Sequence, residues 1–183
     1  MIIPGKEPDF TKIDYLRTGT RKQREIYELL IQNGIMSALK DYTPLLTGTF
    51  PLGLDIESSD LDIICYWKDE EKFENTLSRF SFHPHFRIYK RMIKGKLTVI
   101  AHFVISNYRF EVFGQNCPVR QQDSFRHMMN EYFILKKSGE AFKEKIIEMK
   151  KKGIKTEPAF AQLLGLEGDP FEALLDYPAE LPE

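Results

Sequence analysis

Residues 60–67 combine two acids with an apolar strand pattern. The run reads DLDIICYW, so Asp60 and Asp62 alternate with Leu61 and Ile63. Successive side chains of a β-strand point to opposite faces, and the alternation therefore predicts a strand with both carboxylates on one face. Two adjacent acids on one strand face are unusual unless a cation lies there. We therefore expect a divalent metal at this position.

A glycine turn comes shortly before this strand. The segment that ends at Thr47 reads as an apolar strand, and Gly48-Thr49 follows it. Gly48 lets the backbone approach a phosphate group, and the Thr49 hydroxyl is able to donate a hydrogen bond to it. A Gly-Thr pair alone carries no information, and its value here comes from its spacing to Asp60.

These residues together resemble the signature of the polymerase-β-type nucleotidyltransferase superfamily, and in particular its small bacterial, minimal or antibiotic-modifying members. That signature is an apolar residue, Gly, a small hydroxyl residue, a spacer of about ten residues and then Asp-apolar-Asp-apolar. Gly48, Thr49, Asp60 and Asp62 match it, and Ser59 precedes the first acid as in a looser form of the pattern. The resemblance covers residues 40–115.

The resemblance implies a transfer of a nucleoside monophosphate, most plausibly AMP, from a nucleoside triphosphate to a hydroxyl group, with release of pyrophosphate. It implies two Mg²⁺ ions held by Asp60, Asp62 and a third acid on a later strand. Glu111, within the strand pattern YRFEVF, is the candidate for that acid, either as a metal ligand or as a general base. Gly48, Thr49 and Ser59 are expected to bind the nucleotide.

Other interpretations of the same residues remain open. The two aspartates are also compatible with an exposed edge strand, and Glu111 with an ion pair to Arg109 on the same strand face. Leu52 stands where many superfamily members carry Arg. This departure favours an alternative in which the chain is a catalytically inactive nucleotide-binding module, and a toxin–antitoxin interaction module is a further alternative.

Several other polar residues have simpler explanations. The basic residues of segment 87–96 are expected to form a solvated face, in which Lys90 or Arg91 is the candidate to reach the triphosphate. His102 lies in an apolar strand and reads as a packing residue. His127 and Glu131 are four residues apart in a helical pattern, which predicts a helical ion pair or a contact at the edge of the core.

Composition limits the partners. The 183-residue chain has 26 Lys and Arg against 27 Asp and Glu, a net charge of −1, which disfavours long nucleic acid as a partner. We expect a small-molecule or protein acceptor, and a homodimer or another protein partner is compatible with the sequence. The two cysteines are too few for a disulfide framework, and no apolar run reaches membrane-spanning length, which favours a cytoplasmic protein.

Periodicity predicts both strands and helices, and the resemblance implies an α+β, nucleotidyltransferase-like fold: a mixed, mostly antiparallel sheet with helices on one side, followed by C-terminal helices. Strands are expected at 43–48, 61–67, 86–93, 96–105 and 108–113, and helices at 21–31, 35–39, from 69, at 121–138 and at 139–152, with short helices from 156 and 169. We expect a nucleotidyltransferase-like core at 1–118 and a helical region packed on it at 119–183.

Overall fold

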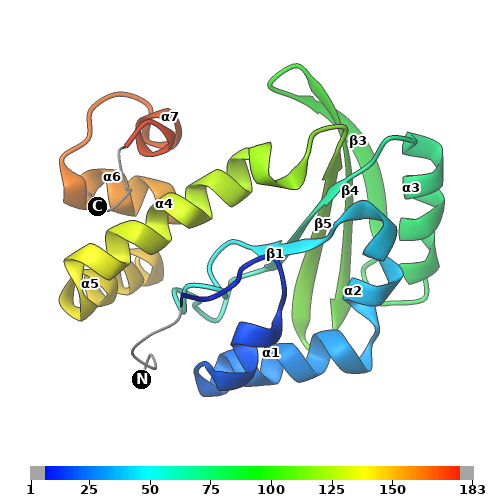
Figure 1. Ribbon diagram of the computed structural model, residues 1–183, viewed down its shortest axis with the longest axis horizontal. Coiled ribbons are helices and arrows are strands. Elements are labelled where there is room, and N and C mark those ends of the chain that lie inside the picture. Colours follow the sequence, from blue (N-terminus) through cyan, green and yellow to red (C-terminus); the bar gives the residue numbers. More distant parts are fainter. Residues whose placement is uncertain (1–6, 178–183) are drawn as a thin grey trace. The chain divides into compact units, whose positions relative to one another are not determined.

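The computed structural model describes residues 7–177, which divide into two compact units (Figure 1). The first unit consists of the described part of Met1–Thr47 together with Asp60–Val119. The second consists of Gly48–Ser59 together with the described part of Arg120–Glu183. The division predicted from the sequence differs in residues 48–59, which it placed in the core, and it remains a prediction.

A five-stranded sheet forms the centre of the first unit. Its strands are β1 (Leu45–Thr47), β2 (Leu61–Tyr66), β3 (Arg87–Ile93), β4 (Lys96–Ile105) and β5 (Tyr108–Gln115). Their order across the sheet is β1-β2-β5-β4-β3. Only the β2–β5 pair is parallel. The predicted α+β fold with a mixed, mostly antiparallel sheet is confirmed, and β1 and β3 are the edge strands.

Two tight turns connect strands β3, β4 and β5. Lys94 and Gly95 both have positive φ angles, 47° and 74°, as do Ser106 and Asn107 at 49° and 69°. Two-residue turns of this kind match the twist of antiparallel strands. They join β3 to β4 and β4 to β5, as the sequence predicted.

The helices of the first unit are α1 (Arg21–Gln32), α2 (Ile35–Ala38) and α3 (Glu70–Leu77), with short 3₁₀ helices at Asp14–Thr18, Lys40–Tyr42 and Ser78–Phe80. Thr20 begins α1 with a capping box to Gln23, and the Asp69 side chain caps α3. Both caps satisfy backbone N–H groups that a helix start leaves without partners. The helix starts predicted at these positions are therefore confirmed.

Helices α1 and α3 contact the same face of the sheet. The Tyr108 hydroxyl of β5 donates a hydrogen bond to Glu25 of α1 at 2.6 Å. On the same face of β5, Gly114 has no side chain, and a Cβ there would overlap the Phe73 ring of α3. Phe73 is fully buried as a result. We call this side of the sheet the helix face and the other side, which carries Asp62 and Glu111, the site face.

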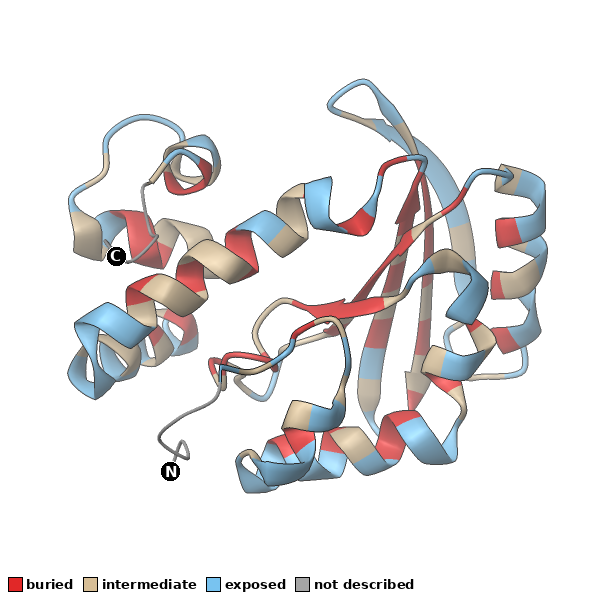
Figure 2. Cartoon of the chain, viewed as in Figure 1, coloured by how far each residue is buried: buried red, intermediate tan, exposed pale blue. Residues whose placement is uncertain are grey.

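The second unit contains α4 (Asp123–Ser138), α5 (Glu140–Lys151), α6 (Thr156–Leu164) and α7 (Pro170–Leu175); a 3₁₀ helix, Val119–Gln121, precedes them. The Asn130 side chain of α4 donates a hydrogen bond to the Leu174 carbonyl of α7 at 2.8 Å. Asp169 caps α7, with Pro170 in its first turn. Buried residues follow one side of α4 and α6 (Figure 2). The C-terminal helices expected from the sequence are present.

Within residues 7–177, none of the helices is both long enough and apolar enough to cross a membrane.

Candidate active site

A row of paired residues crosses the sheet of the first unit from one edge to the other. Thr47 of β1 pairs with Asp62 of β2, and Asp62 pairs with Glu111 of β5. Glu111 in turn pairs with His102 of β4, and His102 pairs with Arg87 of β3. Residues paired in this way lie on one face of a sheet, so the five side chains share the site face.

Asp62 and Glu111 are the centre of this row. They are direct neighbours on the parallel strands β2 and β5, and both are half-buried. Neighbouring strands are about 4.8 Å apart, and like charges directly opposite each other on one sheet face are destabilising, which favours a cation near the pair. The structure thus brings together two of the three acids predicted from the sequence.

Asp60 precedes β2 and pairs with an arginine. Arg109 of β5 donates a hydrogen bond through Nε to Asp60 Oδ1 at 2.5 Å. Arg109 and Glu111 are two residues apart on β5 and therefore share the site face. Arg109 thus pairs with Asp60, whereas the sequence alone suggested an ion pair between Arg109 and Glu111.

His102 makes polar contacts on the site face that its apolar sequence context did not predict. Its Nε2 atom lies 3.3 Å from Glu111 Oε2 and 3.1 Å from the Tyr89 hydroxyl. The Tyr89 ring also stacks on the imidazole, with 5.8 Å between the ring centroids. His102 lies beside the acids because of the strand register, which cannot be read from the apolar run around it.

Several charges act on His102 from different strands. Burial is the largest effect and lowers the pKa of His102. The Glu111 and Asp60 carboxylates raise the same pKa, and the Arg87 and Arg91 guanidinium groups lower it. The net pKa is below its ordinary value, so this imidazole is mainly neutral near pH 7. Charged groups of both signs therefore act on this imidazole.

The acids provide the oxygen donors that Mg²⁺ prefers. Asp62 and Glu111 are neighbours, but Asp60 is engaged with Arg109. Among residues 7–177, no three His, Cys, Asp or Glu side chains are close enough together to hold a metal ion. The oxygen donors of these acids are thus of the chemical kind that suits Mg²⁺, but the structure does not bring all three together while Asp60 pairs with Arg109.

The three residues predicted to bind nucleotide lie in the second unit. Gly48 follows β1 directly in the chain and has a φ of 73°, in the left-handed region that favours glycine. The Thr49 carbonyl accepts hydrogen bonds from the backbone of Leu52 and Leu54, forming a turn. Ser59 Oγ accepts a hydrogen bond from the Ile56 backbone at 2.9 Å. Their nucleotide-binding role remains a prediction.

Lys90 does not face the acids. Its ammonium group contacts Glu70 and Glu74 of α3 at 2.5 and 2.7 Å, which places it on the helix face. The suggestion that Lys90 reaches a triphosphate is therefore wrong. Arg91, the other basic residue singled out from this strand, directly follows Lys90 in β3, so strand alternation places it on the opposite, site face.

His127 and Glu131 are buried in the second unit. Their exposed fractions are 7% and 3%, so they lie deeper than the predicted core-edge contact. Burial and the Glu157 charge raise the pKa of Glu131, and the Lys150 charge lowers it. The rise is the larger effect. This cluster contains no residue predicted to take part in catalysis.

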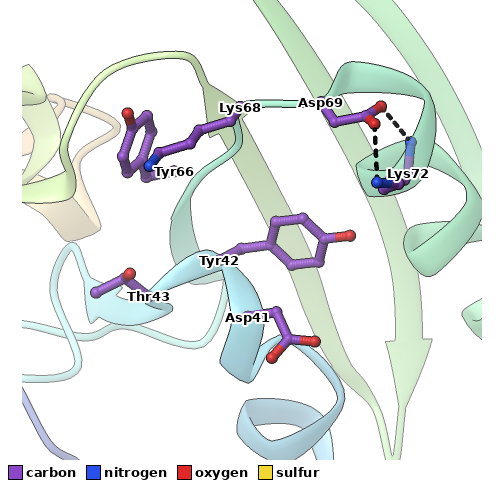
Figure 3. Close-up of a pocket in the computed structure, with 7 residues that line it drawn as sticks. All are labelled: Asp41, Tyr42, Thr43, Tyr66, Lys68, Asp69 and Lys72. Atoms are coloured by element: carbon purple, nitrogen blue, oxygen red, sulfur yellow. Dashed lines mark hydrogen bonds and ion pairs between the residues drawn. The ribbon is translucent and has the colours of Figure 1, made fainter.

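A surface pocket of about 450 Å³ lies elsewhere in the first unit (Figure 3). Its lining includes Tyr42, Tyr66, Lys68 and Lys72, and the Lys68 ammonium lies 6.0 Å from the centre of the Tyr66 ring. Asp69 forms an ion pair with Lys72 at its rim (Figure 3). Tyr66 is at the end of β2 opposite to Asp60, and the pocket contains none of the predicted site residues.

Solved structures show the same fold at low sequence identity. The Cid1 poly(U) polymerase bound to Mg 3′-dATP is 13% identical, with a TM-score of 0.52 over 78% of this chain and 46% of that chain. The GLD-2/RNP-8 complex is 12% identical, with a TM-score of 0.50 over 82% of this chain and 60% of that chain. The chain therefore has a nucleotidyltransferase-like fold and spans less than two thirds of the solved chains it matches.

No curated protein matches the chain. A family model does match, over residues 28–177, and its description is "Domain of unknown function (DUF4269)". This match covers most of the sequence. The chain therefore belongs to the DUF4269 family.

Proposed function

We propose that this protein is a metal-dependent nucleotidyltransferase that moves a nucleoside monophosphate, most plausibly AMP, from the triphosphate to a hydroxyl of a small molecule or protein. The observation that carries this proposal is the register of β2 and β5. It makes Asp62 and Glu111 neighbours on the site face, with Asp60 one alternation away. The nucleotidyltransferase-like fold supports the same reaction class.

Asp60, Asp62 and Glu111 would hold Mg²⁺, in one or two ions, and Asp60 would exchange Arg109 for the metal. Bound Mg²⁺ supplies positive charge that offsets the charge of the triphosphate and of the transition state. One of the structural neighbours, the Cid1 poly(U) polymerase, was solved with Mg 3′-dATP bound. Gly48, Thr49 and Ser59 are the proposed contacts of the nucleotide phosphates.

The proposed transfer is a substitution at the α-phosphorus of the nucleoside triphosphate. The acceptor oxygen forms a bond to the α-phosphorus of the triphosphate. The bond from that phosphorus to the bridging oxygen breaks, and its electron pair leaves on pyrophosphate. The hydroxyl proton passes to Glu111, if this residue acts as general base, or to solvent. His102, 3.3 Å from the Glu111 carboxylate, helps to orient it.

The test is nucleotide binding by calorimetry, with ATP in the presence of Mg²⁺ or EDTA. The wild-type protein is expected to bind ATP only with Mg²⁺. Asp62→Asn removes one charge at the centre of the row and is expected to weaken that binding at least tenfold. Glu71→Gln is the matched control, because Glu71 is an exposed acid on α3, which packs on the helix face.

Equal affinities of wild type and Asp62→Asn for ATP and Mg²⁺ would contradict the proposed site. If ATP binds as expected but no pyrophosphate is released with any of a broad panel of hydroxyl acceptors, the chain is an inactive nucleotide-binding module. Circular dichroism and thermal unfolding of each variant establish that a loss of binding is not a loss of fold.

A further inference from the structure

Strand β3 divides its cationic side chains between the two faces of the sheet. Lys90 points to the helix face, where Glu70 and Glu74 neutralise it. Arg87 lies three residues before Lys90 in β3, and Arg91 lies one residue after it. Side chains an odd number of residues apart point to opposite faces of a strand, so both arginines lie on the site face. Within residues 7–177, neither arginine has an ion-pair or hydrogen-bond partner of its own, in contrast to Lys90.

The strand register places Arg87 near the acids and Arg91 four residues further along the same face of β3. Arg87 pairs with His102 in the β3–β4 register, and His102 contacts Glu111. Both guanidinium groups also affect the pKa of His102, as the Glu111 and Asp60 carboxylates do. Two strand spacings separate Arg87 from Glu111, which is about 10 Å between their Cα atoms.

Tyr89 lies between the two arginines on the same face. Its hydroxyl lies 3.1 Å from His102 Nε2, and the residue is 38% exposed. Arg87 and Arg91 are exposed as well, because β3 is the last strand of the sheet. Arg87, Tyr89 and Arg91, which we call the β3 cationic face, therefore form an open surface on the same side of the sheet as the carboxylates.

The row has two different ends. At the β1 end is Thr47, which the proposed triphosphate residue Gly48 follows directly in the chain. At the β3 end is Arg87, an exposed residue of an edge strand that has no ion-pair partner among residues 7–177. Arginine binds phosphate through a planar pair of donors, which suits it to recognise a phosphorylated ligand. A polycationic acceptor would instead be repelled from this edge.

From these observations we propose that the β3 cationic face binds the phosphate of a small acceptor, a phosphorylated molecule whose free hydroxyl is then presented to Glu111. This inference rests on the proposed nucleotidyl transfer and narrows its acceptor to an anionic class. The chemistry of transfer is unchanged. The acceptor hydroxyl forms the new bond to phosphorus and pyrophosphate leaves, while the phosphate that the acceptor already carries takes no part.

The experiment is an NMR titration of the ¹⁵N-labelled full chain with ribose 5-phosphate, and with ribose as the uncharged counterpart. EDTA is present and nucleotide is absent, so metal-dependent binding does not contribute. We expect ribose 5-phosphate, but not ribose, to shift the Nε–H signals of Arg87 and Arg91. The double variant Arg87→Gln/Arg91→Gln is expected to bind at least tenfold more weakly.

Lys90→Gln is the matched control, since it removes one positive charge from the same strand on the opposite face. It is expected to bind ribose 5-phosphate within twofold of wild type. Equal affinities of wild type and the double arginine variant, or an equal loss in Lys90→Gln, would overturn the proposal. So would shifts confined to residues outside β3.

Two further titrations distinguish a failure of this inference from a failure of the proposed nucleotidyl transfer. Titration with ATP and Mg²⁺ tests nucleotide binding alone: if it succeeds while ribose 5-phosphate does not bind β3, the inference fails and the proposed function stands. If ATP does not bind, both fail. A hexauridylate that binds more than a hundredfold tighter than ribose 5-phosphate would overturn the small acceptor in favour of nucleic acid.

Discussion

Removal of Arg109 is expected to strengthen metal binding. In the structure, Arg109 Nε lies 2.5 Å from Asp60 Oδ1, and the two side chains are 56% and 40% exposed. The variant Arg109→Gln frees the Asp60 carboxylate and removes a positive charge from the position that a metal would approach. Both effects favour a divalent cation, so the change in affinity has a definite sign.

The magnitude follows from the exposure of the pair. An exposed ion pair contributes about 0.2–1 kcal/mol, and this is the most that metal binding loses by releasing Asp60. A unit charge and a dication about 7 Å apart in water repel each other by roughly 1.2 kcal/mol. Together these effects predict an affinity gain of about 1–2 kcal/mol, or roughly 5- to 30-fold.

The assay is the Kd for Mn²⁺ or Mg²⁺ by calorimetry at low ionic strength and again at high salt. Salt screens exposed charges, so the gain should shrink as ionic strength rises. Arg79→Gln removes an exposed charge from the 3₁₀ helix Ser78–Phe80 and serves as the control. An unchanged or weaker metal affinity in Arg109→Gln would refute the assignment of Asp60 as a metal ligand.

Three further predictions concern stability. Gly114→Ala is expected to destabilise the fold by about 1–3 kcal/mol in denaturant unfolding because its Cβ overlaps the Phe73 ring, and by less in a Phe73→Leu background. The raised pKa of buried Glu131 means that the folded state binds a proton more tightly than the unfolded state does. The free energy of unfolding should therefore fall as pH rises above about 4.5. A Glu131→Gln variant whose stability has the same pH dependence as that of wild type would contradict this. Lys90→Gln should lower the thermal unfolding temperature only slightly, with the difference disappearing at high salt, because its ion pairs are partly exposed.

Local sequence signals predicted most of the sheet. The alternation after Asp60 predicted β2, and the pairs Lys94-Gly95 and Ser106-Asn107 predicted the two turns around β4. The first strand is shorter than predicted, because Thr43 has a positive φ of 51°, outside the extended region. Strand alternation and turn residues depend on only a few neighbouring positions, so they can be recognised from the sequence alone.

The contacts of the candidate site depend on register between strands that are far apart in the sequence. Asp60 and Arg109 are 49 residues apart, and nothing near either residue indicates their pairing. His102 was predicted as a packing residue because its neighbours are apolar, although the register with β5 places it against Glu111. Residues 48–59 belong to the second unit because of contacts with residues distant in the sequence, which local patterns also do not predict.

The parallel pairing of β2 with β5 has a consequence for how the protein folds. Antiparallel β3, β4 and β5 are joined by two-residue turns, so they can form early from local contacts. β2 must instead close a loop of several dozen residues before Asp62 meets Glu111, and such long-range pairing forms slowly. The acidic pair is thus assembled only as the sheet is completed. The metal affinity proposed for this pair would then appear only late in folding, when the sheet is complete.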